Sequence, residues 1–176
     1  MTKNQESIVD KGAYGGCRFL CRFLFLIICV GVANMIILPI FLGVTTKNKQ
    51  SEAKRIVSIM NKNQQSYYAE KSVFSPSVDA LAIGIKTETT NYKYSVRATK
   101  KAAFSYGVSK QPELKSSVGG VFVVPAKEVV PNAAKDEIKT ISILCKADNR
   151  STFKPAEPTY ENGKIACGEG TTEVTK

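Results

Sequence analysis

The chain has 176 residues, a net charge of +10 and no histidine. The lack of histidine excludes acid–base catalysis by imidazole, nucleophiles activated by histidine and metal sites with imidazole ligands. The 25 lysine and arginine residues are scattered rather than gathered in one block, which is typical of a solvated basic surface.

The N-terminal residues are predicted to be a polar tail in the cytoplasm. Residues 1–16 are mostly polar and end in Gly15 and Gly16. Basic residues precede the apolar segment that follows, and such residues tend to stay on the cytoplasmic side of a membrane. These residues are Lys3, Lys11, Arg18 and Arg22. We assign residues 1–18 to this tail, although basic residues also follow the apolar segment and charge alone does not fix the orientation.

Residues 23–44 are twenty-two residues without a charge. As a helix they would be roughly 33 Å long, enough for a hydrocarbon core of about 30 Å. A signal peptide has a shorter apolar region and a cleavage site of small residues, and a surface helix of a soluble domain has a polar face. We therefore predict a transmembrane segment over residues 19–44. Its membrane and assembly residues are Phe23, Leu26, Val30, Met35, Leu38, Pro39 and Phe41.

A helical period of apolar residues continues after Val44. The recurring positions are Ala53, Ile56, Val57, Met60, Gln64, Tyr67 and Tyr68. They predict an amphipathic helix to about Glu70, continuous with the apolar segment and bent at Pro39, which lacks a backbone N–H. A turn-rich connection and a short helical or irregular piece over residues 78–83 follow.

Beyond Gly84 the apolar period becomes two, which is typical of strands. Strands are predicted over residues 92–97, 103–108, 118–124 and 138–145. The short connections between them indicate an antiparallel sheet. One face of this sheet can pack on the amphipathic helix, which predicts an α+β domain over residues 45–176.

The five cysteines fall into two groups. Cys17, Cys21 and Cys29 lie in or beside the apolar segment, where thiols most often serve as small apolar residues. Cys145 and Cys167 lie in the soluble part and cannot complete a four-ligand zinc site, because the chain has no histidine. A disulfide between them is expected if the domain lies in an oxidising compartment, and it favours an exported C-terminus. We expect no metal and no cofactor.

The remaining candidates for chemistry favour no enzyme. Asp136 with Glu137, and Glu157 with Glu161, are acid pairs in predicted turns, where acids are usually solvated. The sequon at residues 149–151 is a weak motif on its own. Tyr67 and Tyr68 could stack on a sugar or a base, but their positions on the helix favour the core.

Short stretches of the chain recur together in a known protein family. They are LPIFL at 38–42, QSEAK at 50–54, NKNQQSYY at 61–68, Phe74, LAIGIKTET at 81–89, NYKYS at 91–95, LKSSVGGVF at 114–122, ILC at 143–145, PTY at 158–160 and CG at 167–168. In this order and spacing the chain resembles the type IV pilins and pseudopilins, most closely the cyanobacterial type IV pilin-like G and H proteins.

The resemblance implies a pilin-like α/β-roll, in which a long N-terminal helix packs its second half on a four-stranded antiparallel sheet. Family members are membrane proteins that a prepilin peptidase cuts after a glycine, and their apolar helices form the core of a fibre. The implied function is that of a structural minor pilin or pseudopilin in a pilus or secretion apparatus. The implied partners are the membrane, other pilin-like subunits and that machinery. The implied location is the inner membrane with a periplasmic C-terminal domain, or the pilus at the cell surface.

The chain departs from the family pattern in the processing region. Aligning Pro39 with the family's proline places Cys17 at the glycine before the cut and Arg22 at the family's glutamate. A shift by one residue lets Gly16 precede the cut but places Cys21 at the glutamate position. Because the acid is missing in both registers, we expect no cleavage. The alternative function is a membrane-anchored periplasmic binding module that does not assemble and contacts a partner, a polysaccharide or DNA.

Overall fold

The computed structural model describes residues 13–82, 84, 86–130, 132, 134 and 137–174, and it leaves out the side chains of residues 13–21, 23 and 33–44. The chain divides into two compact units, Met1–Val44 and Thr45–Lys176. We call the second the globular unit.

A single helix, α1, runs from Ala13 to Lys71. It begins six residues before Phe19, so that Ala13 to Arg18 are helical although we assigned them to the tail. Glycines at positions 15 and 16 cost a helix only about 1 kcal/mol each, which the apolar residues that follow can offset. The helix ends as predicted, because Ser72 takes a positive φ of 55° and its N–H donates to the Tyr68 carbonyl at 2.8 Å. Residue 39 lies within α1, and the side chain of Pro39 is outside the described residues. The bend at this position stays a prediction.

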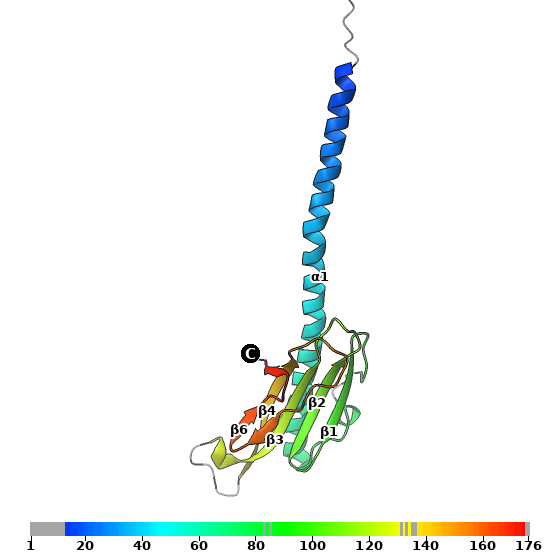
Figure 1. The fold of residues 1–176 in the computed structure, drawn as a ribbon. Coiled ribbons are helices and arrows are strands. Elements are labelled where there is room, and N and C mark those ends of the chain that lie inside the picture. The colour runs from blue at the N-terminus through cyan, green and yellow to red at the C-terminus, as the bar shows by residue number, and fades with distance from the viewer. Residues whose placement is uncertain are drawn as a thin grey trace, which may run out of the picture. The chain divides into compact units, whose positions relative to one another are not determined.

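The globular unit contains a five-stranded antiparallel sheet in the order β1-β2-β3-β4-β7 (Figure 1). Its strands are β1 (Tyr92–Ala98), β2 (Ala102–Ser109), β3 (Ser117–Pro125), β4 (Ile138–Ala147) and β7 (Thr171–Glu173). A second sheet pairs β5 (Thr159–Glu161) with β6 (Lys164–Ala166), and the 3-10 helices are η1 (Asp79–Leu81) and η2 (Ala126–Glu128). The four predicted strands and the α+β class are confirmed.

The predicted number of four strands in the sheet was wrong, because β7 adds a fifth strand beside β4. The register pairs Cys145 with Glu173 and Ala147 with Thr171. Strands of three residues are too short for an alternating pattern to be recognised. The hairpin of β5 and β6 escaped prediction for the same reason.

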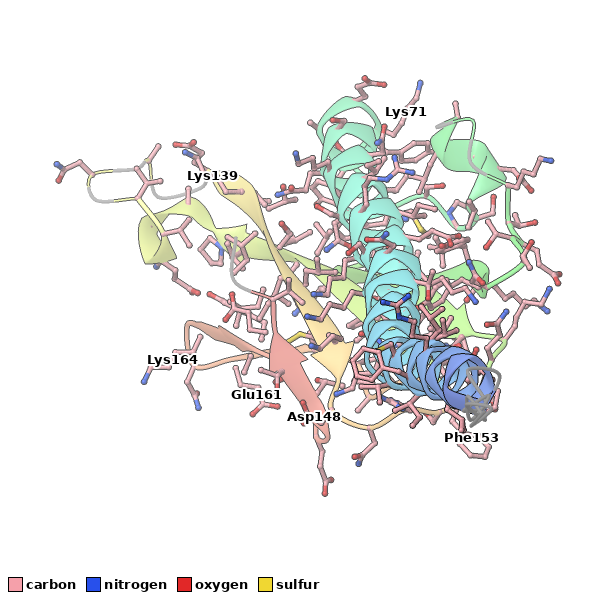
Figure 2. All side chains as sticks on the ribbon, turned by 90° about the horizontal axis from the view of Figure 1, so that it is seen from above. Lys71, Lys139, Asp148, Phe153, Glu161 and Lys164 are labelled. Atoms are coloured by element: carbon pink, nitrogen blue, oxygen red, sulfur yellow. A yellow bond between two sulfur atoms is a disulfide. The ribbon has the colours of Figure 1, made fainter. Side chains whose placement is uncertain are left out.

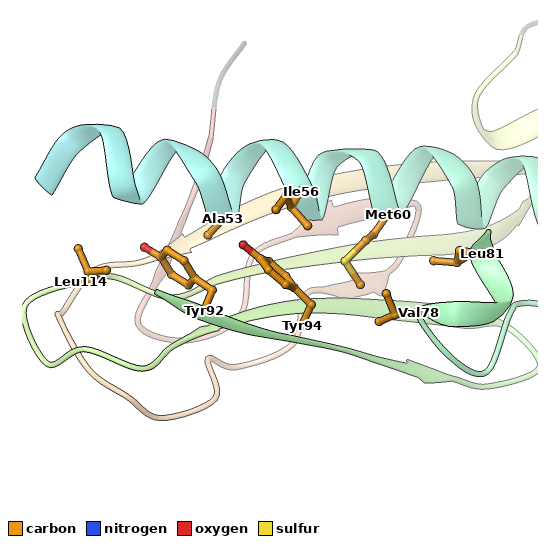
Figure 3. Packing of buried hydrophobic residues seen from close by; sticks show 8 residues of the cluster. All are labelled: Ala53, Ile56, Met60, Val78, Leu81, Tyr92, Tyr94 and Leu114. Atoms are coloured by element: carbon orange, nitrogen blue, oxygen red, sulfur yellow. The ribbon is translucent and has the colours of Figure 1, made fainter. Parts of the chain in front are cut away.

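The core between α1 and the sheet is built from the predicted helix stripe (Figure 3). Ala53, Ile56, Val57 and Met60 are each at most 6% exposed. Figure 3 shows Tyr92 and Tyr94 of β1 facing the helix, together with Leu114, Val78 and Leu81. Burying a side chain the size of isoleucine or methionine stabilises a fold by about 1.5–3 kcal/mol, so this stripe is a main support of the unit.

Two glycines allow the helix to approach the sheet closely. A Cβ added at Gly107 would lie 3.2 Å from Val57 and 3.3 Å from Ala53. A Cβ at Gly119 would lie only 2.2 Å from Asn61 Oδ1. Larger residues at these positions of β2 and β3 would push α1 away from the sheet.

The opposite face of the sheet carries a second core. Phe104 and Phe122 meet edge to face with their ring centroids 5.7 Å apart, and Tyr160 of the β5–β6 hairpin packs on Phe122 at 6.0 Å. Cys145 and Cys167 belong to the same cluster. The C-terminal hairpin therefore covers the face that α1 leaves open.

Candidate functional site

The first candidate is the apolar part of α1. Seven large apolar side chains of this part are between 52% and 68% exposed: Leu24, Phe25, Leu26, Ile27, Ile28, Val30 and Val32. Because successive helical residues are about 100° apart, these side chains point to every side of the helix. Leu26 and Val30 are thus exposed apolar residues, and their role in assembly stays a prediction. The side chains of Phe23, Met35, Leu38, Pro39 and Phe41 lie outside the described residues.

Over the residues that the structure describes, no helix combines the length and the hydropathy that a membrane crossing requires. Residues 33–44, which form the second half of the predicted apolar segment, have side chains outside that description.

The processing region lies inside α1, which begins at Ala13. Gly16 and Cys17 are helical, but the side chain of Cys17 lies outside the described residues. Arg22 is exposed. Cys29 is an exposed free thiol in the apolar part.

A carboxylate at the start of the amphipathic part fixes α1 to the loop before β1. Glu52 accepts hydrogen bonds from Thr89 Oγ1 at 2.7 Å, Asn91 Nδ2 at 2.9 Å and the Tyr94 hydroxyl at 3.3 Å. Burial, together with the charge of Glu52, raises the pKa of Tyr94 well above its usual range. Tyr94 therefore remains a neutral phenol that can donate to Glu52.

Three amide side chains hold the second half of α1 in place. Asn61 donates to the Ile143 carbonyl at 2.9 Å, and Gln65 donates to the Thr140 carbonyl at 3.1 Å. Gln64 donates to the backbone carbonyl of Ser75 and accepts from its N–H, each at 2.9 Å. Of these three residues, the amphipathic pattern in the sequence placed only Gln64 on the buried stripe. Asn61 and Gln65 each follow a residue of that stripe, Met60 and Gln64, and this position is the feature of the sequence that could have identified them.

The tyrosines after these amides are core residues, as predicted. Tyr68 packs its ring on Phe74 with centroids 4.7 Å apart, and Tyr67 packs against the cluster that contains Met60. Both are partly buried, so they do not form an exposed stacking platform.

The predicted disulfide is confirmed. Cys145 and Cys167 are bonded, with their Cα atoms 5.8 Å apart. The bond joins β4 to the segment just before β7, and it closes the loop that carries the β5–β6 hairpin. This fixes the second core on the outer face of the sheet.

Glu157 attaches the same loop to the sheet. Its carboxylate accepts from Arg97 Nε at 2.7 Å and from the Tyr106 hydroxyl. The hydrogen bond from Arg97 is the main reason that the pKa of Glu157 lies below its ordinary value. Lys154 Nζ lies 3.6 Å from the centroid of the Tyr106 ring. Glu157 is thus a structural ion-pair residue, whereas Glu161 forms no ion pair among the described residues.

The other acid pair is also a surface feature. Glu137 lies 3.9 Å from Lys139 Nζ, and Asp136 lies outside the described residues. No group of three histidine, cysteine or acidic side chains that could hold a metal occurs in the described part of the chain.

A groove lined by both polar and apolar residues runs between α1 and the part of β4 that β7 does not pair with. Its larger section has a volume of about 560 Å³, and the smaller one, about 350 Å³, shares Gln65 with it. The side chains that line the larger section include Ser58, Lys62, Ser142 and Glu173. β7 pairs only with residues 145–147 of β4, so the groove lies beside an unpaired strand edge. Its hydroxyl, amide and charged groups can form hydrogen bonds, and they lie beside the apolar residues Ile143, Leu144 and Val174.

Comparison with known proteins identifies a family match over most of the chain. Residues 50–168 match the model of the family described as type IV pilin-like G and H. The match includes the second half of α1, the disulfide and all strands except β7. Neither a search of curated proteins nor a search of solved structures returned a match.

Proposed function

This chain belongs to the type IV pilin-like G and H family, and from that premise we propose that it is a minor pilin or pseudopilin anchored in the inner membrane. The proposal rests on the exposed apolar side chains on every side of α1 between Leu24 and Val32, in a helix that continues into the family-matched unit. The family is a structural one, and the function would be packing and surface presentation rather than catalysis.

The exposed apolar side chains of α1 must be shielded from water by lipid or by another protein surface. Leaving a leucine, isoleucine or phenylalanine side chain in water costs about 1.5–3 kcal/mol, and residues 24–32 would add several such costs. Lipid tails or the apolar helices of other pilin-like subunits would remove them. The same segment would then serve as the anchor before assembly and as the packing surface within a fibre.

The proposed topology has residues 1–18 in the cytoplasm, residues 19–44 across the membrane and residues 45–176 in the periplasm or on the cell surface. The disulfide supports an exported globular unit, because such bonds persist in oxidising compartments. The processing region, with Arg22 at the family's glutamate position, supports a chain that keeps its N-terminus.

The departure of the processing region from the family pattern also supports a second candidate. This is a binding module that stays in the membrane and does not enter a fibre. Its contact surface would be the groove beside β4, where Lys62, Gln65 and Ser142 offer hydrogen-bonding groups. A polysaccharide fits these groups better than DNA does, because the groove holds Glu173 as well as Lys62.

Fractionation of cells that produce the natural chain separates the two candidates. Recovery in fibres sheared from the cell surface supports the pilin subunit. Recovery in membranes alone supports the anchored module. Recovery as single dissolved subunits without detergent would contradict both, because neither allows the apolar segment to remain uncovered.

A further inference from the structure

We propose that one end of the globular unit rests on the lipid headgroups, with Phe153 inserted among them and Arg150 at their phosphates. This inference rests on the proposed membrane anchor. The end in question, which we call the proximal end, comprises residues 45–49, 110–116 and 148–155.

The sheet register brings these segments together. Ser117 at the start of β3 pairs with Lys146 near the end of β4, and Ser109 at the end of β2 pairs with Tyr92. The loops after β2 and after β4 therefore leave the sheet at the same end (Figure 1). Lys49 of α1 reaches this end, because its Nζ donates to Gln111 Oε1 at 3.4 Å.

In the sequence, the first segment of the proximal end follows directly after the predicted span. Thr45 is the first residue of the globular unit, and Lys49 follows about 6 Å further along the helix axis. A headgroup layer extends about 5–8 Å beyond the hydrocarbon core on each side. If the span ends at Val44, Lys49 and the loop that it contacts would lie at the depth of the headgroups.

Phe153 is the apolar residue that makes this surface unusual. It is 79% exposed and lies at the periphery of the unit (Figure 2). Its backbone is held, because the Phe153 carbonyl accepts from Ser116 Oγ at 3.4 Å and the nearby Ser151 N–H donates to the Leu114 carbonyl at 3.3 Å. A fixed loop thus presents an apolar ring to the surroundings, and phenylalanine is among the residues that interfacial segments bury at the boundary of headgroups and acyl chains.

Cations accompany the ring. Arg150 is exposed, and Lys47, Lys49 and Arg150 form no ion pair among the residues that the structure describes. The proximal end holds two acids: Asp148 accepts from Thr172, and Glu113 is exposed. Six basic residues of the same segments outnumber them: Lys47, Lys49, Lys110, Lys115, Arg150 and Lys154. A lysine or arginine near an anionic membrane surface contributes about 1 kcal/mol of attraction, and anionic headgroups would match these side chains.

The lack of tryptophan in this chain allows a direct test with single-tryptophan variants of the full chain. Phe153→Trp reports on the proximal end. Ile138→Trp is the matched control, because Ile138 is 59% exposed at the other end of the sheet. Leu26→Trp reports on the proposed span. Each variant is reconstituted in phosphatidylcholine vesicles containing about one-third phosphatidylglycerol, with lipids brominated near the headgroup or deep in the tails.

The expected result is quenching of Phe153→Trp by the shallow bromines, roughly twofold stronger than for Ile138→Trp, with a blue-shifted emission. The additional change Arg150→Glu, or high salt, should reduce both signals because salt screens the attraction to phosphate.

The other outcomes overturn the inference in distinguishable ways. Equal weak quenching of Phe153→Trp and Ile138→Trp, with Leu26→Trp quenched by deep bromines, removes the headgroup contact and leaves the anchor intact. An unquenched Leu26→Trp removes the proposed anchor and the inference with it. If the blue shift of Phe153→Trp increases with the protein-to-lipid ratio and the brominated lipids do not quench it, the residue contacts another copy of the chain instead of the headgroups.

Discussion

Glu157 links the C-terminal loop to two strands on the outer face of the globular unit. Two side chains from neighbouring strands, Arg97 of β1 and Tyr106 of β2, donate to its carboxylate. Glu157 and Arg97 are 60 residues apart in sequence, and only the path of the disulfide-closed loop brings them together. No local pattern in the sequence could have predicted this pair, and the same is true of Glu52 with Tyr94.

We predict that Glu157→Gln lowers the stability of the unit at neutral pH and flattens its dependence on acid pH. The folded-state pKa of Glu157 is lowered, chiefly by the hydrogen bond from Arg97. A carboxyl group of this kind stabilises the fold above its unfolded pKa of about 4.3, and the contribution is lost as the pH falls through the lower folded pKa. The difference between parent and variant should therefore shrink from about pH 5 to pH 3 in urea unfolding experiments. Glu161→Gln is the matched control and should change neither quantity.

At the scale of the elements, the packing of α1 on the sheet was largely predictable. The buried stripe from Ala53 to Met60 and the four long strands follow from apolar periods of about 3.6 and 2 residues, which are strong when a segment is long. The positions of β7 and of the β5–β6 hairpin were not predictable, because their strands have three residues each and depend on the disulfide and the second core.

We predict that residues 45–176 fold as a soluble monomer without the apolar segment, and that Ile56→Asp destabilises this fragment by about 3 kcal/mol or more. Ile56 is only 6% exposed, so the new carboxylate would be buried against β1. Arg55→Asp introduces the same charge at the exposed neighbouring position and should cost far less. Urea unfolding of the three proteins measures both changes, and equal midpoints for Ile56→Asp and the parent would contradict this packing.

We predict that removing the disulfide by replacing Cys145 and Cys167 with serine costs on the order of 3 kcal/mol, because the bond closes a loop of about 20 residues in the unfolded chain. Hydrogen exchange should increase most in β7 and the β5–β6 hairpin and least in β1 and β2. Cys29→Ser is the control and should leave exchange unchanged. Mass mapping of the natural protein without reduction should find the linked peptides, and two free thiols there would refute the bond.

At the scale of the whole molecule, the family was recognisable from the sequence because its short motifs keep their order over most of the chain. The family match over residues 50–168 agrees with that reading. The fate of the N-terminus was less predictable, since cleavage depends on single residues that a peptidase must recognise. In neither register does the chain carry both the family's glycine before the cut and its glutamate after it. With Cys17 before the cut, Arg22 stands at the glutamate position, and Gly16 can precede the cut only in the other register.

We predict that the natural chain keeps its first sixteen residues, and that Cys17→Gly combined with Arg22→Glu creates a shorter form when prepilin peptidase is present. The double variant restores the glycine before the cut and the acid after it. The intact mass of protein purified from its native membrane reports cleavage and N-methylation in one measurement.

A matched control for processing combines Cys17→Gly with Arg18→Glu, which adds the same acid outside the family's register. This control should remain full length. A natural chain that is already shortened after Gly16 or Cys17 would contradict this prediction and would indicate that it is processed as other pilins are.

The way α1 lies along the sheet has a mechanical consequence. Within the globular unit, the helix contacts the sheet through Glu52 near the start of β1, Asn61 over β4 and Gln65 near the start of β4. The helix and the strands run side by side (Figure 3). A pull on Thr45 along the helix axis would load these contacts together in shear instead of breaking them one at a time from one end. A subunit suspended from its helix would therefore resist tension through many contacts at once.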